Sequence, residues 1–183
     1  MSIQVSNLVH PFICLSGMYP IDILSEKCKI IAIIGSNGSG KTSFLKLLLK
    51  ELQPKRGEVV VNGEISFLGI KNGLKPQIIL RKQLPYFSTT NAPFPWPQFL
   101  NMPYQELSAG QQRLVALWLI LQSTKPIILL DEPFMHLDDN AKKLACDWLN
   151  SVVALGKTII LTHHNLDELG KIKNLQILDL NCY

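Results

Sequence analysis

Apolar residues along this chain follow two repeating patterns, each typical of one kind of secondary structure. Short runs rich in Ile, Leu and Val, such as Lys29–Ile34 and Pro126–Leu130, are typical of strands buried on both faces of a sheet. Longer segments such as Thr42–Leu52 and Asn140–Leu155 place apolar residues at helical spacing. Because strands and helices alternate, the sequence predicts an α/β fold, with a mostly parallel sheet and helices on both of its faces.

An antiparallel edge to this sheet is predicted in the first third of the chain. Ile3–Leu8 alternates apolar and polar residues, as a half-buried strand does. Glu58–Val61 and Ile65–Leu68 flank an Asn62–Gly63 turn, a pair of residues typical of a hairpin. We expect these three segments to form the edge. Two further strands are predicted at Thr158–Leu161 and Leu175–Leu180.

The stretch from Lys71 to Leu107 differs from the rest because it holds six of the eleven prolines. Proline disrupts a helix interior, so no continuous helix is expected across Pro93–Pro103. We predict a single domain over residues 1–183, with an irregular insert at about 71–107. Aromatic residues in this insert form either a docking surface for a partner or a small core of their own. They are Tyr86, Phe87, Phe94, Trp96, Phe99 and Tyr104.

Composition narrows the classes to which the protein can belong. The formal net charge is only +4 and no long run of Lys or Arg is present, so a nucleic-acid partner is not expected. The apolar runs are far shorter than the roughly 20 residues of a membrane span, and the N-terminus lacks the layout of a secretory signal. The four cysteines form no CxxC pair, so they indicate neither a zinc site nor a redox pair.

A glycine-rich loop lies between the first buried strand and the first predicted helix. Residues 35–42 read GSNGSGKT, which fits the phosphate-loop pattern GxxxxGK[ST] in the strand–loop–helix context that the motif requires. Glycines let backbone N–H groups curl around an anion, and the helix N-terminus adds unpaired donors. We expect Lys41 to reach the terminal phosphates of ATP and Thr42 to bind Mg²⁺. The predicted nucleotide-binding residues are Gly35, Ser36, Asn37, Gly38, Ser39, Gly40, Lys41, Thr42 and Ser43.

Two consecutive carboxylates, Asp131 and Glu132, follow the buried strand Ile127–Leu130. Ligands of open α/β sheets bind at the carboxyl ends of the strands, where this pair lies. We expect Asp131 to hold Mg²⁺, directly or through water, and Glu132 to act as general base toward the attacking water. The alternative is an ordinary solvated strand end with a helix N-cap.

The segment Leu107–Arg113, with the sequence LSAGQQR, has the form of a helix start. Ser108 can cap the helix, while Ala109 and Gly110 leave room for an anion at its N-terminus. The segment resembles the LSGGQ signature of the ATP-binding-cassette (ABC) ATPases, with Ala109 in place of one glycine. The resemblance extends over almost the whole chain.

Two further segments lie where the ABC family has functional loops. Phe134–Asp138, with the sequence FMHLD, occupies the place of the D-loop, and His163 that of the switch histidine. The resemblance implies that His163 bonds to the γ-phosphate, the attacking water or Glu132. His164 is the weaker candidate, and the sequence leaves open which nitrogen of His163 carries a proton.

The family resemblance also implies a head-to-tail homodimer. Each ATP would lie between the phosphate loop of one chain and the signature residues of its partner. Hydrolysis would then open the dimer and move integral membrane subunits of a transporter. The expected location is peripheral on the cytoplasmic face of a bacterial inner membrane, or on the matrix side of the mitochondrial inner membrane. The signature residues are Ser108, Ala109, Gly110 and Gln111.

Within the ABC family, the chain is most similar to the ATP-binding subunits of haem exporters in cytochrome c maturation. The similarity rests on LSAGQQR followed by Val115–Leu117, on Phe67–Gly69 and Gly73–Lys75, and on the short length. It implies ATP-driven haem handling, with haem itself on the membrane subunits. The alternatives are an exporter of another small solute, a non-transport ABC ATPase and a degenerate nucleotide-binding module.

The chain also departs from the family pattern. Ile70 occupies the position of the Q-loop glutamine, and an Ile side chain can neither bind a metal nor orient water. Gln77 or Gln83 could take that role only if the loop shifted. Either Phe12 or His10 is expected near the position of the adenine-stacking aromatic residue, although core packing or a turn explains each equally well.

Overall fold

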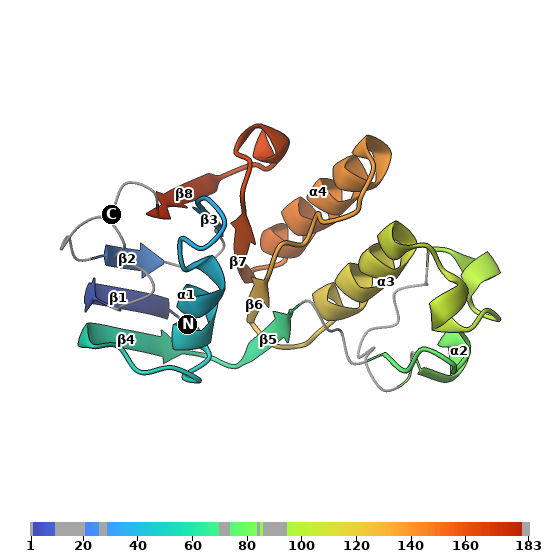
Figure 1. Cartoon of the computed structure of the whole chain (residues 1–183), viewed down its shortest axis with the longest axis horizontal. Helices are drawn as coiled ribbons and strands as arrows, with labels where there is room; N and C mark the ends of the chain where they lie inside the picture. Colours follow the sequence, from blue (N-terminus) through green and yellow to red (C-terminus); the bar gives the residue numbers. More distant parts are fainter. Residues whose placement is uncertain are drawn as a thin grey trace.

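Two β-sheets and four α-helices form the part of the chain that the structure describes (Figure 1). The structure is a computed structural model, and it describes residues 2–9, 21–25, 29–69, 74–83, 85 and 95–180. In Figure 1 the smaller sheet lies at the left, and the helices α3 and α4 cover the larger sheet on the right.

The smaller sheet is antiparallel, with the strand order β2-β1-β4. It consists of β1 (Ser2–Val9), β2 (Ile21–Ser25) and β4 (Arg56–Asn62). Ile3 and Val5 of β1 are buried at alternate positions, as the predicted half-buried strand requires, and Leu8 is buried after an irregularity in the pairing. The predicted antiparallel pairing is therefore confirmed for β1 and β4, which together with β2 form a sheet of their own rather than an edge of the larger one.

The larger sheet has five parallel strands in the order β5-β6-β7-β3-β8. The central strands β3, β6 and β7 are buried at every position, which explains their continuous apolar sequences. The five strands are β5 (Ile65–Leu68), β6 (Ile127–Leu130), β7 (Thr158–His163), β3 (Ile30–Ile34) and β8 (Leu175–Asp179). The α/β fold with a parallel-centred sheet is thus confirmed.

The prediction for Ile65–Leu68 was wrong in one respect, because this strand does not return along β4 as a hairpin. It continues into the larger sheet, where Ile65 pairs in parallel with Ile127 and Leu68 with Leu130. The Asn62–Gly63 turn therefore connects the two sheets. Leu68 is buried in the core that α3 and α4 share, and this burial accounts for the different pairing.

Helices cover both faces of the larger sheet and bury alternate residues of its strands. One core joins β1 and α1 (Lys41–Leu48) to the face that carries Ile31 and Ile33. The other core joins α3 (Ala109–Leu121) and α4 (Asp139–Ala154) to the opposite face, which carries Ile30 and Ala32. This layering leaves the carboxyl ends of the strands as an edge that the loops can line.

The described part of the insert packs as a small core against α3 and α4. This core includes Leu74, Leu80 on α2 (Leu80–Gln83), and Tyr104. Trp96 stands edge-on to Trp148 of α4, with ring centroids 5.4 Å apart. The packing supports the small-core alternative for Trp96, Phe99 and Tyr104, whereas Tyr86, Phe87 and Phe94 lie outside the described residues.

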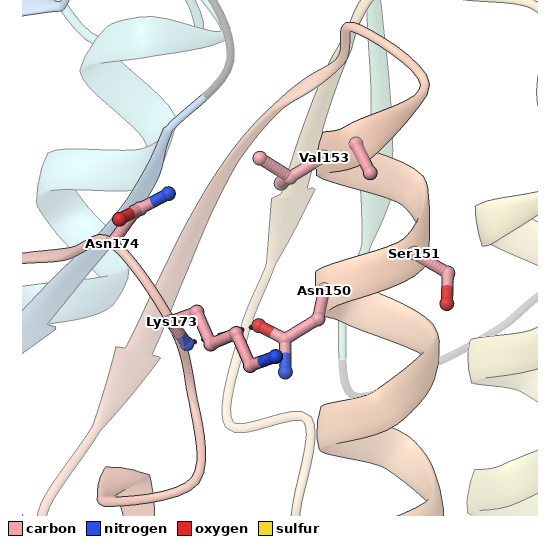
Figure 2. Close-up of a pocket in the computed structure, with 6 residues that line it drawn as sticks. Asn150, Ser151, Val153, Lys173 and Asn174 are labelled. Carbon is pink, nitrogen blue, oxygen red and sulfur yellow. Dashed lines mark hydrogen bonds between the residues drawn. The ribbon is translucent and has the colours of Figure 1, made fainter.

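A hollow of about 510 Å³ lies at the opposite edge of the larger sheet, beside the C-terminal half of α4 (Figure 2). Asn150 bridges its wall, since its amide donates to the carbonyl of Lys171 at 3.2 Å and accepts from the backbone N–H of Lys173 at 2.9 Å. The amino ends of β7 and β8 adjoin this region. The hollow is therefore separate from the edge where the predicted site residues gather.

Candidate active site

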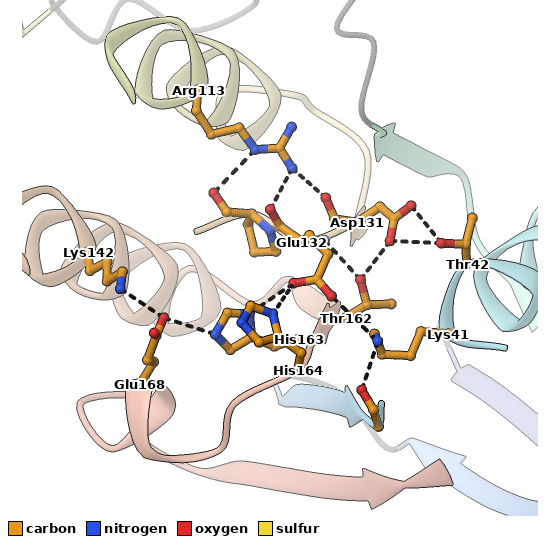
Figure 3. Close-up of polar contacts among 12 residues, drawn as sticks. Lys41, Thr42, Arg113, Asp131, Glu132, Lys142, Thr162, His163, His164 and Glu168 are labelled. Atoms are coloured by element: carbon orange, nitrogen blue, oxygen red, sulfur yellow. Dashed lines mark hydrogen bonds and ion pairs between the residues drawn. The ribbon is translucent and has the colours of Figure 1, made fainter. Parts of the chain in front are cut away.

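The carboxyl ends of the parallel strands bring the predicted site residues to one edge of the larger sheet (Figure 3). β3 runs into Gly35, β6 into Asp131 and Glu132, and β7 ends at His163. Because parallel strands all present their carboxyl ends on the same side, residues about 30 to 130 positions apart in sequence meet here. The order of strands thus assembles the site.

The phosphate loop forms a cradle at the N-terminus of α1. Gly40 precedes the helix with a φ of 95° and provides no side-chain cap, so the first N–H groups of α1 stay available. A Cβ on Gly35 would lie 2.4 Å from Ser39 Oγ, so only glycine fits there. Ser39 Oγ is buried and has no hydrogen-bond partner among the described residues. Unpaired donors around a space closed to side chains fit a bound phosphate group.

Lys41 lies across the mouth of this cradle. Its Nζ donates to the carbonyl oxygens of Gly35 at 2.8 Å and Ser36 at 3.1 Å. The same Nζ lies 3.6 Å from Glu132 Oε1, which makes an ion pair. The ammonium group is therefore held where it can meet both a phosphate in the cradle and the second carboxylate of the acidic pair.

Asp131 is buried and accepts hydrogen bonds from two threonine hydroxyl groups. Thr42 Oγ1 donates to Oδ2 at 3.0 Å, and Thr162 Oγ1 donates to Oδ1 at 2.7 Å. Carboxylate and hydroxyl oxygens are ligands that Mg²⁺ prefers, so Thr42 and Asp131 fit a magnesium site. Thr162 also accepts from the backbone N–H of Glu132 at 2.9 Å. Thr162 was not predicted from the sequence, although its place next to His163 was an available signal.

Glu132 is held between a lysine and two histidines. Its Oε2 lies 3.1 Å from His163 Nδ1 and 3.2 Å from His164 Nδ1, whereas Oε1 faces Lys41. Burial alone would raise the pKa of Glu132, but the hydrogen bonds from both histidines and the charge of Lys41 outweigh it. The pKa therefore lies below the ordinary value of 4.5. The side chain is an ionised carboxylate at neutral pH, as a general base must be.

His163 is 1% exposed and contacts a carboxylate on each side of its ring. Opposite Glu132, its Nε2 lies 3.1 Å from Glu168 Oε2, and this same oxygen lies 3.0 Å from Lys142 Nζ. The hydrogen bond from Lys142 is the largest influence on Glu168 and, with that from His163, lowers its pKa below 4.5. No sequence pattern marked Glu168 or Lys142, because each lies in an exposed polar segment.

The signature segment forms the start of α3. Ser108 Oγ accepts from the backbone N–H of Gln111 at 3.3 Å, and Gln111 Oε1 accepts from the backbone N–H of Ser108 at 2.9 Å. This reciprocal capping box confirms the helix start that the sequence predicted. A Cβ on Gly110 would lie 2.7 Å from the carbonyl oxygen of His136. Gly110 therefore allows close contact between this helix and the segment Phe134–Asp138.

Arg113, at the end of the LSAGQQR sequence, joins α3 to the loop that carries the acidic pair. Its buried guanidinium donates to the carbonyl oxygens of Asp131, Glu132 (3.0 Å) and Pro133 (3.3 Å). A further bond of 2.9 Å reaches the carbonyl of Gly69, just after β5. Glu132 has a φ of 47°, which is unusual for a residue other than glycine, and Arg113 holds the carbonyl of this residue. No role for Arg113 was predicted from the sequence.

Comparison with known proteins places this site in a family. The family model for ABC transporters matches residues 20–135, from the small sheet through the phosphate loop and the acidic pair. The chain belongs to the ABC transporter family. It is an ATP-binding subunit of an ABC transporter.

Similar ABC proteins serve different transporters. The chain is 31% identical to the cytochrome c biogenesis ATP-binding export protein CcmA of Bordetella bronchiseptica, over 81% of this chain and 77% of that protein. It is 29% identical to the thiamine import ATP-binding protein ThiQ of Photobacterium profundum, over 84% and 75% of the two chains. A bacterial ABC transporter cassette solved as a dimer superposes with a TM-score of 0.76 at 20% identity, covering 97% and 94%. This last similarity supports the fold.

Several predicted features of the ABC family cannot be placed. Ile70, at the Q-loop position, and both adenine-stacking candidates, His10 and Phe12, lie outside the described residues. Gln83 is buried and bonds to the backbone of Lys75 and Ile78, so its amide is used within the insert. Within the described ranges, no helix is both long and apolar enough to cross a bilayer.

Proposed function

We propose that this ABC subunit hydrolyses ATP at the edge of the larger sheet, with Glu132 as the general base. The position of the Glu132 carboxylate supports this proposal most directly. One oxygen lies 3.6 Å from the lysine of the phosphate loop, and the other lies 3.1 Å from the buried ring of His163. An ionised carboxylate held beside the phosphate cradle is suited to take a proton from an attacking water.

The phosphate loop has the groups needed to bind the nucleotide. The free N–H groups of α1, the unpaired Ser39 Oγ and the Lys41 ammonium all suit the β- and γ-phosphates. Thr42 and Asp131 would hold Mg²⁺, which supplies positive charge against the phosphate oxygens when it is bound. The nucleotide-binding set that we propose is completed by Gly35, Ser36, Asn37, Gly38, Gly40 and Ser43.

Glu132 and His163 have different roles in the proposed reaction. Glu132 removes a proton from water, the water oxygen bonds to the γ-phosphorus, and the bond between this phosphorus and the β–γ bridging oxygen breaks. ADP and inorganic phosphate are the products. A neutral imidazole donates through one nitrogen only. In the tautomer that donates from Nδ1, His163 holds the Glu132 carboxylate. In the tautomer that donates from Nε2 to Glu168, Nδ1 can accept a hydrogen bond from the attacking water.

The signature segment completes the site of a second chain in this proposal. Ser108, Ala109, Gly110 and Gln111 lie at the start of α3, where backbone N–H groups are directed outward and can meet an anion. A head-to-tail homodimer would place this helix start against the γ-phosphate bound by the partner. The dimer of the related cassette supports this arrangement.

For the cargo, we propose haem handling in cytochrome c biogenesis together with integral membrane subunits. The similarity to CcmA and the LSAGQQR sequence support this assignment. The similarity to ThiQ favours a second candidate, a transporter of another small solute, because cargo is selected by the membrane subunits. The proposed location is the cytoplasmic face of the bacterial inner membrane, or the matrix side of the mitochondrial inner membrane.

ATP hydrolysis by the purified protein tests the first part of this proposal. We expect Glu132→Gln to lower kcat by about 100-fold or more, because the amide keeps the shape of the side chain but cannot act as a base. Asp147→Asn, an acid-to-amide change at an exposed position of α4, is the matched control and should hydrolyse ATP normally. Wild-type rates in Glu132→Gln would refute the role of Glu132.

Co-purification of native membrane subunits tests the cargo. Recovery of haem-handling subunits of cytochrome c biogenesis would support the first candidate. Recovery of a permease for another solute would support the second and refute the first.

A further inference from the structure

Three potential metal ligands converge at the site from two neighbouring strand ends. Glu132 Oε2, His163 Nδ1 and His164 Nδ1 lie within 4.8 Å of one another, and the carboxylate oxygen is 3.1 Å and 3.2 Å from the two nitrogens (Figure 3). Both imidazole rings thus present the same type of nitrogen to one oxygen. These three residues are called the His-His-Glu triad below.

We propose that the His-His-Glu triad is an inhibitory binding site for a transition-metal ion such as Zn²⁺. Two histidines and one glutamate, with a fourth position left for water, form a ligand set that zinc uses in proteins. The proposed magnesium site differs in chemistry, because Thr42 and Asp131 offer oxygen atoms only. Nitrogen ligands favour zinc over magnesium. Zinc would therefore bind at the triad, and magnesium at Thr42 and Asp131.

The surroundings of His163 support a metal ligand in a second way. A histidine that binds a metal usually donates its other ring N–H to a carboxylate, which fixes the ring and its tautomer. His163 Nε2 lies 3.1 Å from Glu168 Oε2, and Lys142 holds this carboxylate from the other side at 3.0 Å. Donation from Nε2 to Glu168 leaves the lone pair of Nδ1 directed at the triad.

The solvent exposure of the triad and the charge of nearby Lys41 affect how a metal ion would bind. The side chain of His164 is 58% exposed and that of Glu132 is 22% exposed, so an ion can enter from solvent past His164. Lys41 lies on the other oxygen of Glu132, at 3.6 Å, and its positive charge opposes a second cation. Binding should therefore tighten when this charge is removed.

The consequence for catalysis rests on the function proposed above for Glu132. A metal ion on Oε2 would occupy the lone pair that otherwise accepts the proton of the attacking water. It would also take Nδ1 of His163 away from the water. Zinc at the triad should consequently reduce ATP hydrolysis by at least about 100-fold, the lower end of what a general base contributes.

Titration with Co²⁺ in the absence of nucleotide tests the binding site directly. Co²⁺ substitutes for Zn²⁺ at such sites and gives visible ligand-field bands when it is four- or five-coordinate with nitrogen ligands. We expect one equivalent of Co²⁺ to bind to the wild-type protein and Zn²⁺ to displace it. His164→Asn should abolish the bands, and the exposed control His136→Asn should keep them. Bands that persist in His164→Asn, or a wild-type protein without bands, would overturn the proposal.

Two further variants test the details of the site. Glu168→Gln should weaken Co²⁺ binding by about 10- to 100-fold, as loss of a partner to a metal-bound histidine does. Lys41→Ala should tighten Co²⁺ binding several-fold, although it should lose ATP binding. An unchanged affinity in both variants would contradict the arrangement described here.

The last test measures the rate of ATP hydrolysis at buffered concentrations of free Zn²⁺, with Mg²⁺ and ATP in excess. Wild-type hydrolysis should fall at least about 100-fold at saturating zinc, and His164→Asn should retain its own zinc-free rate under the same conditions. Equal inhibition of both would refute the triad as the inhibitory site. Failure of the proposed function gives a different result, since a protein without ATPase activity would still show the cobalt bands.

Discussion

At the scale of single residues, Arg113 shows how a buried charge can organise a loop. Burial lowers the pKa of its guanidinium, and the charges of Asp131 and Glu132 offset only part of this effect. Its hydrogen bonds go to four backbone carbonyl oxygens on two separate segments. The planar fork of arginine can satisfy these acceptors together, which the single ammonium group of lysine cannot do.

We therefore expect Arg113→Lys to disturb catalysis more than binding. Loss of two or more bonds to buried carbonyls should lower the free energy of unfolding by about 2 kcal/mol or more. The kcat for ATP should fall because Glu132 loses support, while KM changes little because the phosphate loop is untouched. Urea unfolding and steady-state kinetics measure both effects. Arg81→Lys, at an exposed position of α2, is the control, and an equal loss in both variants would contradict this account.

The low pKa of Glu132 predicts how acid affects stability. A carboxylate whose pKa is lower in the folded than in the unfolded protein stabilises the fold above its ordinary pKa. This contribution is lost as the pH falls from 4.5 through the lower value of the folded state. On acidification through this range, the wild type should lose more unfolding free energy than Glu132→Gln. Urea unfolding at neutral pH and at a pH well below 4.5 measures the loss of unfolding free energy in each protein. Equal losses in the wild type and in Glu132→Gln would contradict this prediction.

At the scale of elements, the sequence predicted strands and loops better than contacts between loops. Runs of β-branched and apolar residues identified β3, β6 and β7 because each is buried on both faces. The phosphate loop and acidic pair were found because glycines and carboxylates follow those strands directly. The pairing of β5 and the contact between His163 and Glu168 were not predictable, since both depend on how distant segments pack.

The start of α3 provides a test of packing between two elements. In Gly110→Ala, the new Cβ would lie 2.7 Å from the carbonyl oxygen of His136, so the helix start must move away from Phe134–Asp138. Alanine favours a helix over glycine by about 1 kcal/mol, yet we expect a net loss of thermal stability because backbone atoms clash. In the control, Gly170→Ala, the nearest atom is an ordinary 3.5 Å away. Differential scanning calorimetry compares the two, and a gain of stability in Gly110→Ala would show that the contact relaxes freely.

At the scale of the whole molecule, the residues of the proposed site come from several elements. The phosphate loop, the acidic pair and His163 all lie along the carboxyl edge of the larger sheet, while the start of α3 approaches from the insert side. In the proposed function, one chain thus offers two helix N-termini to phosphate groups, one at α1 and one at α3. In a head-to-tail pair, each nucleotide would contact the start of α1 from one chain and the start of α3 from the other.

This arrangement predicts that ATP stabilises a dimer when hydrolysis is blocked. Glu132→Gln should bind ATP with Mg²⁺ and form a dimer that persists, because the nucleotide that joins the chains is not consumed. Multi-angle light scattering should give twice the monomer mass in ATP and the monomer mass in ADP. Lys41→Ala is the control that should stay monomeric in both. A Glu132→Gln protein that remains monomeric in ATP would contradict the head-to-tail model.

The order of strands in the larger sheet also affects how a growing chain acquires its function. β3 lies between β7 and β8, so both hydrogen-bonded neighbours of the strand before the phosphate loop are made late in synthesis. On the ribosome, a nascent chain that ends at residue 130 already contains the whole phosphate loop, but β3 has no parallel partner. Five consecutive apolar residues then stay unpaired until the last strands emerge, and such a segment is prone to aggregate. Nucleotide binding should therefore arise only after nearly the full length is translated, and chaperones that shield apolar segments would act before that point.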